Sequence, residues 1–111
     1  AREGHIIATH SWSHKKLDEM TPEQARRDIA RGFESVRAAL GRSAEGAVKP
    51  LFRFPFYAQT PALLTFLSDS GVAVISADVS SEDWKGQAPE VTRERTMTRL
   101  KRRGGGILVL H

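Results

Sequence analysis

Short apolar segments alternate with helix-like segments along this chain of 111 residues, and this alternation constrains the fold more than any other feature. Alternating strands and helices are typical of a parallel sheet with helical crossovers. The sequence therefore predicts a single α/β domain over residues 1–111, in the order β-α-β-α-β-α-β. The four strands are expected at His5–Thr9, Pro50–Phe54, Val72–Ala77 and Ile107–Leu110.

The first predicted helix has clear start and stop signals. Thr21 is a suitable N-cap, Pro22 takes the first helical position, Gln24 can complete a capping box, and Gly41 ends the helix. Apolar residues at spacings of three and four predict one buried face. That face comprises Ala25, Ile29, Phe33, Val36 and Leu40.

The other two helices follow from similar signals. One opens at Thr60-Pro61, turns its leucines inward and closes at Gly71, and the other spans Pro89–Arg103 before three glycines. Between them, Val72–Ala77 is a nearly continuous apolar run, which predicts a strand buried on both faces. The inward leucines are Leu63, Leu64 and Leu67.

The basic residues do not form a pattern typical of nucleic-acid binding. Seventeen Lys and Arg residues against thirteen Asp and Glu residues give a net charge of +4. The dense runs are Arg26-Arg27 and Lys101–Arg103, and the second lies at a predicted helix C-terminus, where cations are favoured. Aromatic residues make up only 7% and do not interleave with the cations, so no nucleic-acid partner is expected. The positive charge instead suits an anionic surface or polymer.

Composition also restricts the kinds of site and segment. The chain has no cysteine, which excludes disulfides and Cys-ligated metals but leaves the redox compartment open. No apolar run approaches the roughly 20 residues of a membrane span, so no transmembrane segment is expected.

Polar side chains lie at or directly after the ends of all four predicted strands. They are His10, Arg53, Asp78 and His111. In parallel α/β folds, chemistry gathers at the carboxyl ends of strands. The sequence therefore predicts a functional site at this edge of the sheet.

His10 and His14 are candidates for binding one metal ion. On a single helical turn, histidines four residues apart would lie on one face, about 5–6 Å apart. Taken alone, the pair also fits two loop histidines, and catalytic zinc usually has three protein ligands. His5 lies inside the predicted strand and is expected to be structural rather than the third ligand.

The other candidate residues also have ordinary explanations. Arg53 interrupts an apolar run, where a buried guanidinium needs a carboxylate partner, but a strand-end arginine can also reach solvent. Asp83 and Trp84 fit a turn as well as a site. His111 follows four apolar residues and fits either a catalytic group or a core histidine.

Taken together, these segments resemble the polysaccharide deacetylases, also known as the NodB-homology domain or carbohydrate esterase family 4. Gly4–His14 (GHIIATHSWSH) is similar to the family's H-[S/T]-x-x-H segment, and Phe52–Phe56 (FRFPF) to its R-x-P-Y segment. Asp83-Trp84 resembles the fourth motif, and Ile107–His111 (ILVLH) the closing I-[V/L]-L-x-H segment. The resemblance spans essentially the whole chain and implies a partial distorted (β/α) barrel of the polysaccharide deacetylase type.

The resemblance implies roles for the residues of the first two motifs. His10 and His14 would bind a divalent metal, commonly zinc, together with an upstream aspartate. Arg53 would hold the aspartate that acts as general base. The backbone N–H of Phe56 would donate to the oxyanion, and Tyr57 would contact substrate where a glycine is common.

The later motifs would supply the general acid and the substrate contacts. Asp83 would pair with His111 and favour its imidazolium form, which protonates the departing amine. Trp84 and Val109 would wall the substrate groove and the acetyl pocket.

One family motif is absent from the chain. A Thr-Phe-Asp-Asp strand supplies the metal-binding aspartate and the base, and no Asp-Asp pair occurs here. The chain is therefore interpreted as the C-terminal portion of the domain, cut at its last motif and inactive without the missing N-terminal part. That interpretation predicts an exposed parallel edge beside the first strand.

Several functions remain open at the level of the sequence. The leading hypothesis is a metal-dependent hydrolase that removes acetyl groups from N- or O-acetylated carbohydrate polymers. The alternatives are a non-catalytic carbohydrate-binding remnant and a related hydrolase of small cyclic amides, with a nucleic-acid module third. Family habit favours an extracellular, periplasmic or cell-envelope location.

Overall fold

The computed structural model describes residues 3–111, which form two compact units. The first runs to Ile75 and the second from Ser76 to His111. In the part of the chain that the structure describes, no helix is long and apolar enough to cross a membrane.

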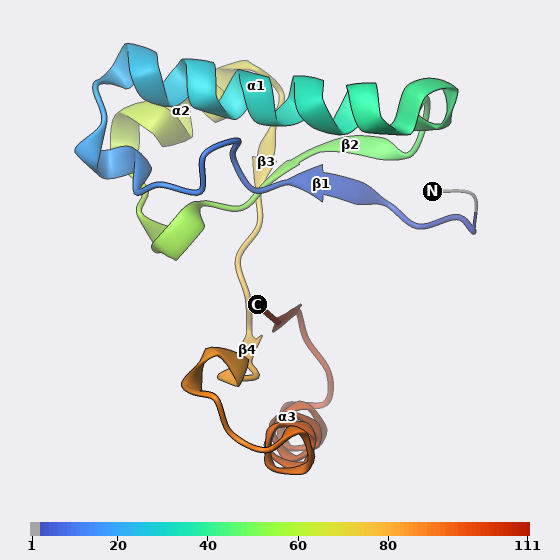
Figure 1. Ribbon diagram of the computed structural model, residues 1–111. Helices are drawn as coiled ribbons and strands as arrows, with labels where there is room; N and C mark the ends of the chain where they lie inside the picture. Colours follow the sequence, from blue (N-terminus) through green and yellow to red (C-terminus); the bar gives the residue numbers. More distant parts are fainter. Residues whose placement is uncertain (1–2) are drawn as a thin grey trace. The chain divides into compact units, whose positions relative to one another are not determined.

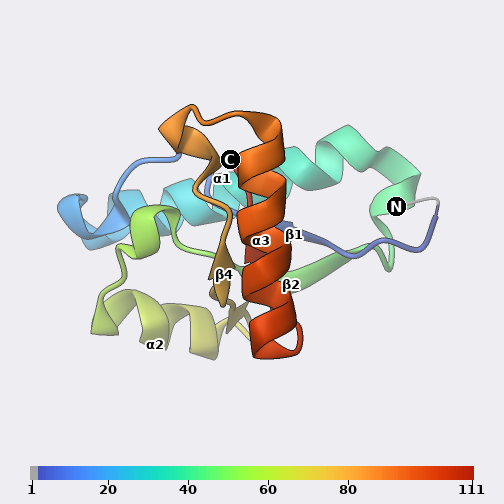
Figure 2. The same ribbon diagram turned by 90° about the horizontal axis from the view of Figure 1, so that it is seen from below.

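The first unit is a three-stranded parallel sheet with helical crossovers (Figure 1). Its strands are β1 (Ile7–Thr9), β2 (Val48–Phe52) and β3 (Ala73–Val74), in the spatial order β1-β2-β3. Helices α1 (Pro22–Leu40) and α2 (Pro61–Asp69) lie side by side and pack against the sheet (Figure 2). The predicted parallel α/β architecture is confirmed in this unit.

The predicted boundaries of α1 are confirmed. Thr21 accepts from the backbone N–H of Gln24, and the Gln24 side chain accepts from the N–H of Thr21, which completes the capping box. Gly41 is the C-cap. Three short 3-10 helices complete the connections of this unit, at Leu17–Glu19, Gly41–Ala44 and Pro55–Tyr57.

The core of the first unit lies between α1, α2 and β2. The rings of Phe52 and Phe54 pack edge to face, with centroids 5.0 Å apart. The stripe of α1 is buried at its N-terminal end and only half-buried at Val36 and Leu40. The buried core residues are Leu17, Ala25, Ile29, Phe33, Phe52, Phe54, Leu63 and Leu67.

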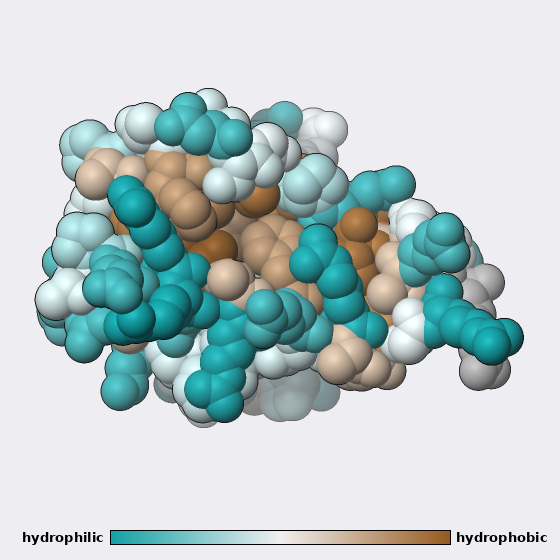
Figure 3. Space-filling view, turned by 90° about the horizontal axis from the view of Figure 1, so that it is seen from above, coloured by the Kyte–Doolittle hydropathy of each residue, from teal (hydrophilic) through white to brown (hydrophobic). Residues whose placement is uncertain are grey.

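Long cations cover the outer side of this core. Seen from the α1 side, hydrophilic side chains cross a hydrophobic band (Figure 3). The guanidinium of Arg26 lies over the Phe66 ring at 5.1 Å, and that of Arg37 over the Phe33 ring at 5.4 Å. Such side chains shield apolar surface while their charged ends stay in water.

The second unit contains a parallel pair of two-residue strands and one helix. They are β4 (Val79–Ser80), α3 (Pro89–Arg103) and β5 (Leu108–Val109), with a 3-10 helix at Asp83–Lys85. The predicted bounds of α3 are confirmed, and Gly104 is its C-cap with φ of 81°.

The third predicted strand was wrong in extent and burial. Val72–Ala77 contains only the two residues of β3, both exposed, and a further strand, β4, follows at Val79. Among residues 3–111, β3 pairs with β2 on one edge and with no strand on the other. Its side chains are therefore exposed rather than buried on both faces. The apolar composition indicated a strand but not what would pack on it.

The first and last predicted strands are also shorter than expected. His5 lies outside β1 and is exposed, where it pairs with Glu3 at 3.5 Å. In Ile107–Leu110 only Leu108–Val109 form β5, and Ile107 and Leu110 are exposed. The Ile107 carbonyl still accepts from the backbone N–H groups of Asp78 and Val79, at 2.8 and 3.1 Å, so some backbone pairing continues past the end of β5.

Candidate functional site

The imidazole of His10 is held by the neighbouring strand. His10 follows β1, and its Nδ1 lies 2.7 Å from the carbonyl oxygen of Arg53, which follows β2. The Arg53 N–H donates to the carbonyl of Thr9 at 3.1 Å, which continues the parallel pairing to this point. Because a carbonyl only accepts, Nδ1 is the donor, and in the neutral imidazole this leaves the lone pair on Nε2. Metal-binding histidines are commonly oriented in this way.

His14 approaches His10 through a loop rather than a helical turn. Ser11 and His14 both have left-handed backbones, with φ of 70° and 53°, and the Ser11 hydroxyl accepts from the His14 N–H. The expectation of a shared helical face was wrong, but the imidazoles still meet, with centroids 4.9 Å apart at 70°. Phe56 packs against His14 from the other motif at 5.1 Å.

Asp28 of α1 holds this loop through hydrogen bonds to its backbone. Its Oδ1 accepts from the backbone N–H groups of Trp12 at 3.0 Å and Ser13 at 3.3 Å. Burial would raise the pKa of the Asp28 carboxyl, but the hydroxyl of Ser13 and these two N–H groups lower it overall. Sequence reasoning missed Asp28.

Gly32 brings α1 against the same loop. A Cβ at this position would lie 2.9 Å from the backbone carbon of Ser11, so only glycine fits the approach. Asp28 and Gly32 lie on the helix face of Ala25 and Ile29, and both are buried. A carboxylate and a glycine inside an apolar stripe were the signal that the sequence contained.

The Phe56–Tyr57 turn has an unusual backbone. Both residues are left-handed, with φ of 55° and 56°, and the Tyr57 N–H donates to the Phe54 carbonyl at 3.2 Å. Residues other than glycine rarely adopt this backbone conformation, and strained turns are common at functional sites. Tyr57 therefore takes the conformation that a glycine would adopt freely. Both side chains are exposed.

The described residues supply neither a third metal ligand nor a carboxylate partner for Arg53. Within residues 3–111, no group of three His, Cys, Asp or Glu side chains could hold a metal ion. No carboxylate in this range forms an ion pair with the half-buried Arg53. His10 and His14 supply two imidazoles, and Arg53 has a guanidinium to offer a carboxylate.

In the second unit, Asp83 organises His111. Its Oδ2 accepts from the His111 backbone N–H at 2.6 Å, and its Oδ1 lies 3.6 Å from His111 Nδ1. The Ser81 hydroxyl donates to Oδ1 at 2.7 Å. The Ser81 hydroxyl and the His111 N–H lower the pKa of Asp83, which keeps the carboxylate ionised beside the imidazole.

Trp84 and Val109 occupy different environments. Trp84 is 57% exposed and packs edge to face on His111, with centroids 4.9 Å apart. Val109 is buried within β5. Their proposed contacts with substrate remain predictions.

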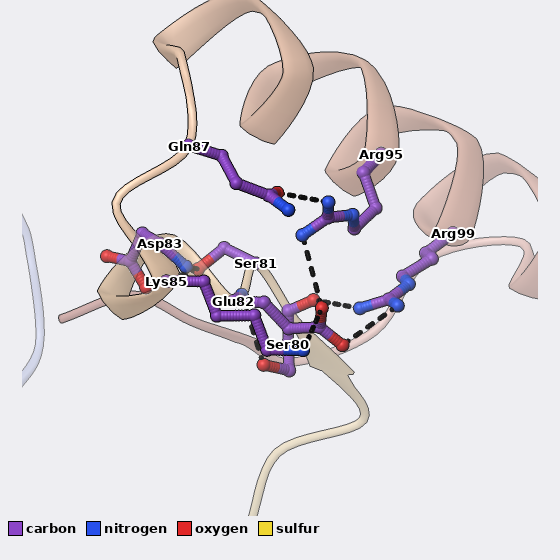
Figure 4. A network of polar contacts seen from close by, with 8 residues as sticks. All are labelled: Ser80, Ser81, Glu82, Asp83, Lys85, Gln87, Arg95 and Arg99. Atoms are coloured by element: carbon purple, nitrogen blue, oxygen red, sulfur yellow. Dashed lines mark hydrogen bonds and ion pairs between the residues drawn. The ribbon is translucent and has the colours of Figure 1, made fainter.

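Glu82 anchors the loop that carries Asp83 (Figure 4). Its backbone is left-handed with φ of 57°, and its carboxylate pairs with Lys85, Arg95 and Arg99 at 3.0–3.1 Å. Arg99 also donates to the Ser80 carbonyl at 2.7 Å, and Arg95 contacts Gln87. The hydrogen bonds from Lys85 and Arg99 lower the pKa of Glu82.

Asp78 does not stand at a strand end, contrary to expectation. It precedes β4, accepts from Arg103 and from the Ile107 backbone N–H at 2.9 Å each, and so ties the end of α3 to β5. Its role in the second unit is structural.

Comparison with known proteins adds a family match. The family model described as polysaccharide deacetylase matches residues 1–75. This range includes His10, His14, Arg53 and the Phe56–Tyr57 turn.

Two solved structures share the fold. The Bc1960 peptidoglycan N-acetylglucosamine deacetylase matches with a TM-score of 0.83 at 22% identity, over 99% of this chain and 48% of that chain. The family 4 carbohydrate esterase from Streptomyces lividans matches with a TM-score of 0.76 at 23% identity, over 98% of this chain and 52% of that one. At these identities the likeness shows the fold.

A curated relative matches the whole chain. The uncharacterized protein YlxY of Bacillus subtilis (strain 168) is 22% identical over 112 residues, covering 100% of this chain and 33% of YlxY. The chain thus spans about a third of this relative and about half of the two solved structures.

Proposed function

Because this chain belongs to the polysaccharide deacetylase family, we propose that it carries part of the site of a metal-dependent hydrolase. The proposed reaction removes acetyl groups from N- or O-acetylated carbohydrate polymers, on a distorted (β/α) barrel of which the chain forms a part. The observation that supports this most is the meeting of His10 and His14, with His10 oriented by the Arg53 carbonyl.

His10 and His14 would hold the divalent ion, for which zinc is the first candidate. Imidazole nitrogens suit this class of ion, and the protonated Nδ1 of His10 leaves Nε2 as its ligating atom. Since catalytic zinc usually has three protein ligands, an aspartate from outside this chain would be the third. A bound ion of this kind supplies an activated water and polarises the acetyl carbonyl.

The remaining first-unit residues would act around the acetyl group. Arg53 would orient the carboxylate of a general base that this sequence does not supply. The Phe56 N–H would donate to the oxyanion, and loss of one such donor typically costs roughly 2.7–4 kcal/mol of transition-state stabilisation. Tyr57 would contact the sugar.

The second unit would contribute the general acid. Asp83 accepts from the His111 backbone and lies beside its ring, which suits an imidazolium that donates a proton to the leaving amine. Trp84 would stack on a sugar and Val109 would border the acetyl group.

Without a base and a third ligand, the 111-residue chain alone is expected to have little activity. Appreciable turnover by the chain on its own would contradict this part of the proposal. A carbohydrate-binding remnant without catalysis and a hydrolase of small cyclic amides are the competing functions. By analogy with the family, the substrate is expected in the cell envelope or outside the cell.

The test is acetate release from an N-acetylated oligosaccharide by the intact protein that contains this chain. We expect His10→Ala and His14→Ala to abolish release and to lower bound zinc. His5→Ala is the matched control, because His5 is exposed and forms its ion pair within residues 3–111 with Glu3, away from the proposed site. Unchanged metal content and release in the His10 and His14 variants would refute the proposal, and binding without release by the unmodified protein would favour the remnant.

A further inference from the structure

A broad groove lies beside His14 in the first unit. Its volume is about 910 Å³, and it is bounded by the loop that carries His14, by α1 and by Phe56. This volume lies within the range of about 300–1,000 Å³ that small-molecule sites usually have. The groove therefore has room for a sugar and a substituent next to the histidine pair.

Cations outnumber carboxylates on the groove wall. The cations are Lys15, Lys16, Arg27 and Arg31, and the carboxylates are Glu19 and Asp28. Asp28 accepts from the backbone of the loop, which leaves it turned toward that loop. A groove with this imbalance favours a negatively charged ligand.

Two of these cations already have carboxylate partners. Lys16 pairs with Glu19 at 3.0 Å, and Arg27 pairs with Glu23 at 2.6 Å. Among the described residues, Lys15 and Arg31 form no ion pair. The charge available to a ligand is thus concentrated on these two side chains.

Arg31 is positioned by an aromatic stack. Its guanidinium carbon lies 3.4 Å from the centroid of the Trp12 ring, so the group meets the ring through its face. The N–H donors of a guanidinium lie in its plane, where they match the two oxygens of a carboxylate or phosphate. Asp28 fixes the backbone of Trp12 at 3.0 Å, which holds the stack in place.

We propose that this groove binds an anionic substituent of the glycan, a carboxylate or a phosphate, with Arg31 as its main contact and Lys15 as a second. The inference rests on the proposed function, because it assigns the substrate an acidic group near the acetylated sugar. It restricts the substrate class from acetylated glycans in general to acidic ones.

The experiment compares three acetylated tetrasaccharides with the intact protein by calorimetry at low salt. One is a neutral N-acetylhexosamine tetramer, the second carries carboxylate ethers on alternate sugars, and the third carries phosphate esters there. We expect at least one anionic tetramer to bind about tenfold more tightly than the neutral one, as a charge-assisted contact provides. Which one does so distinguishes carboxylate from phosphate.

Variants connect the preference to Arg31. Arg31→Ala should abolish it, and Arg31→Lys should keep only part, since lysine lacks the planar donors. Arg37→Ala is the matched control, because it removes the same charge and a similar aromatic contact from α1 outside the groove. Its preference should equal that of the unmodified protein, with thermal unfolding confirming that each variant is folded.

The outcomes separate this proposal from the proposed function. Equal affinity for all three tetramers, a preference that survives Arg31→Ala, or equally tight binding of a DNA duplex would overturn the anion site. Acetate release from the neutral tetramer, measured in parallel, tests the hydrolase alone. Release without an anion preference would support the hydrolase and overturn the anion site. An anion preference without release would support the anion site and overturn the hydrolase.

Discussion

In each unit a buried or half-buried carboxylate holds a loop that carries candidate site residues. In the first unit the carboxylate lies on a helix and binds the loop, whereas in the second unit it lies on the loop and binds cations of a helix. Asp28 lies on α1, is buried, and accepts from the backbone of the His10–His14 loop. Glu82 lies on the loop itself and is held by Lys85 and by the arginines of α3.

The two arrangements differ in what replaces their contacts when they break. The backbone N–H groups that Asp28 satisfies would be left without an acceptor, which is costly when buried. The partially exposed cations around Glu82 would be hydrated instead, and salt screens such pairs. We therefore expect the stability of the first loop to depend on hydrogen bonds and packing. The stability of the second should depend on ion pairs that salt weakens.

Removing Asp28 should have the largest effect. Asp28→Ala leaves two N–H groups without an acceptor, at about 1–3 kcal/mol for each unsatisfied group. Because both are only part-buried, we expect a loss near the lower end of the sum, about 2–3 kcal/mol in the free energy of unfolding. Urea denaturation measures it. Asp28→Asn keeps an acceptor oxygen and should lose less, and equal losses in both variants would show that charge matters more than hydrogen bonding.

Filling the space at Gly32 should have the next largest effect. In Gly32→Ala the new methyl group meets the Ser11 backbone, and overpacking typically costs about 1–3 kcal/mol. Better helix propensity returns about 1 kcal/mol, which Ala38→Gly on the exposed face of α1 measures separately. A net stabilisation in Gly32→Ala would contradict the close approach of helix and loop.

The helices were easier to predict from the sequence than the strands or the contacts of the site. The bounds of α1 and α3 were predicted because caps such as Thr21 and Gly104 act within a few residues. The strands were not, because the length of β3 depends on which neighbours pair with it. The contacts between His10 and the Arg53 carbonyl, 43 residues apart, required the fold.

The supporting residues differ in the same way. Asp28 left a trace, since a carboxylate stood inside an apolar stripe. Glu82 left none, because its partners Arg95 and Arg99 are ordinary surface arginines 13 and 17 residues away. Left-handed backbones at His14 and Tyr57 arise from the loops around them and from nothing in those residue types.

Removing the charge of Glu82 should destabilise less than Asp28→Ala. Glu82→Gln breaks ion pairs that water can replace, so the loss should shrink further in 1 M salt. Glu94→Gln is the control, because it removes the same charge from an exposed position of α3. A loss that matched Asp28→Ala and resisted salt would mean that the network is not a screened one.

The smallest expected effect is a difference in how acid lowers the stability that Asp28 and Glu82 contribute. The pKa of both Asp28 and Glu82 is lowered in the folded chain, so each adds stability above its unfolded pKa, near 4, that is lost as pH falls through the lower folded pKa. We expect the loss below about pH 4 to be reduced in Asp28→Asn at any salt concentration. The Glu82→Gln variant should differ from the unmodified chain only at low salt, as unfolding curves at several pH values will test.

The central claim, that His10 and His14 form a metal-binding pair, is tested most directly by titrating the intact protein with zinc while recording the histidine ring nitrogens by NMR. We predict one ion per chain, with a shift at Nε2 of His10 while its Nδ1–H stays bonded to Arg53, a shift in the His14 ring, and no change at His5. If His10 and His14 stayed unchanged at saturating zinc, or if the Nδ1 of His10 were the ligating atom, the account would be contradicted.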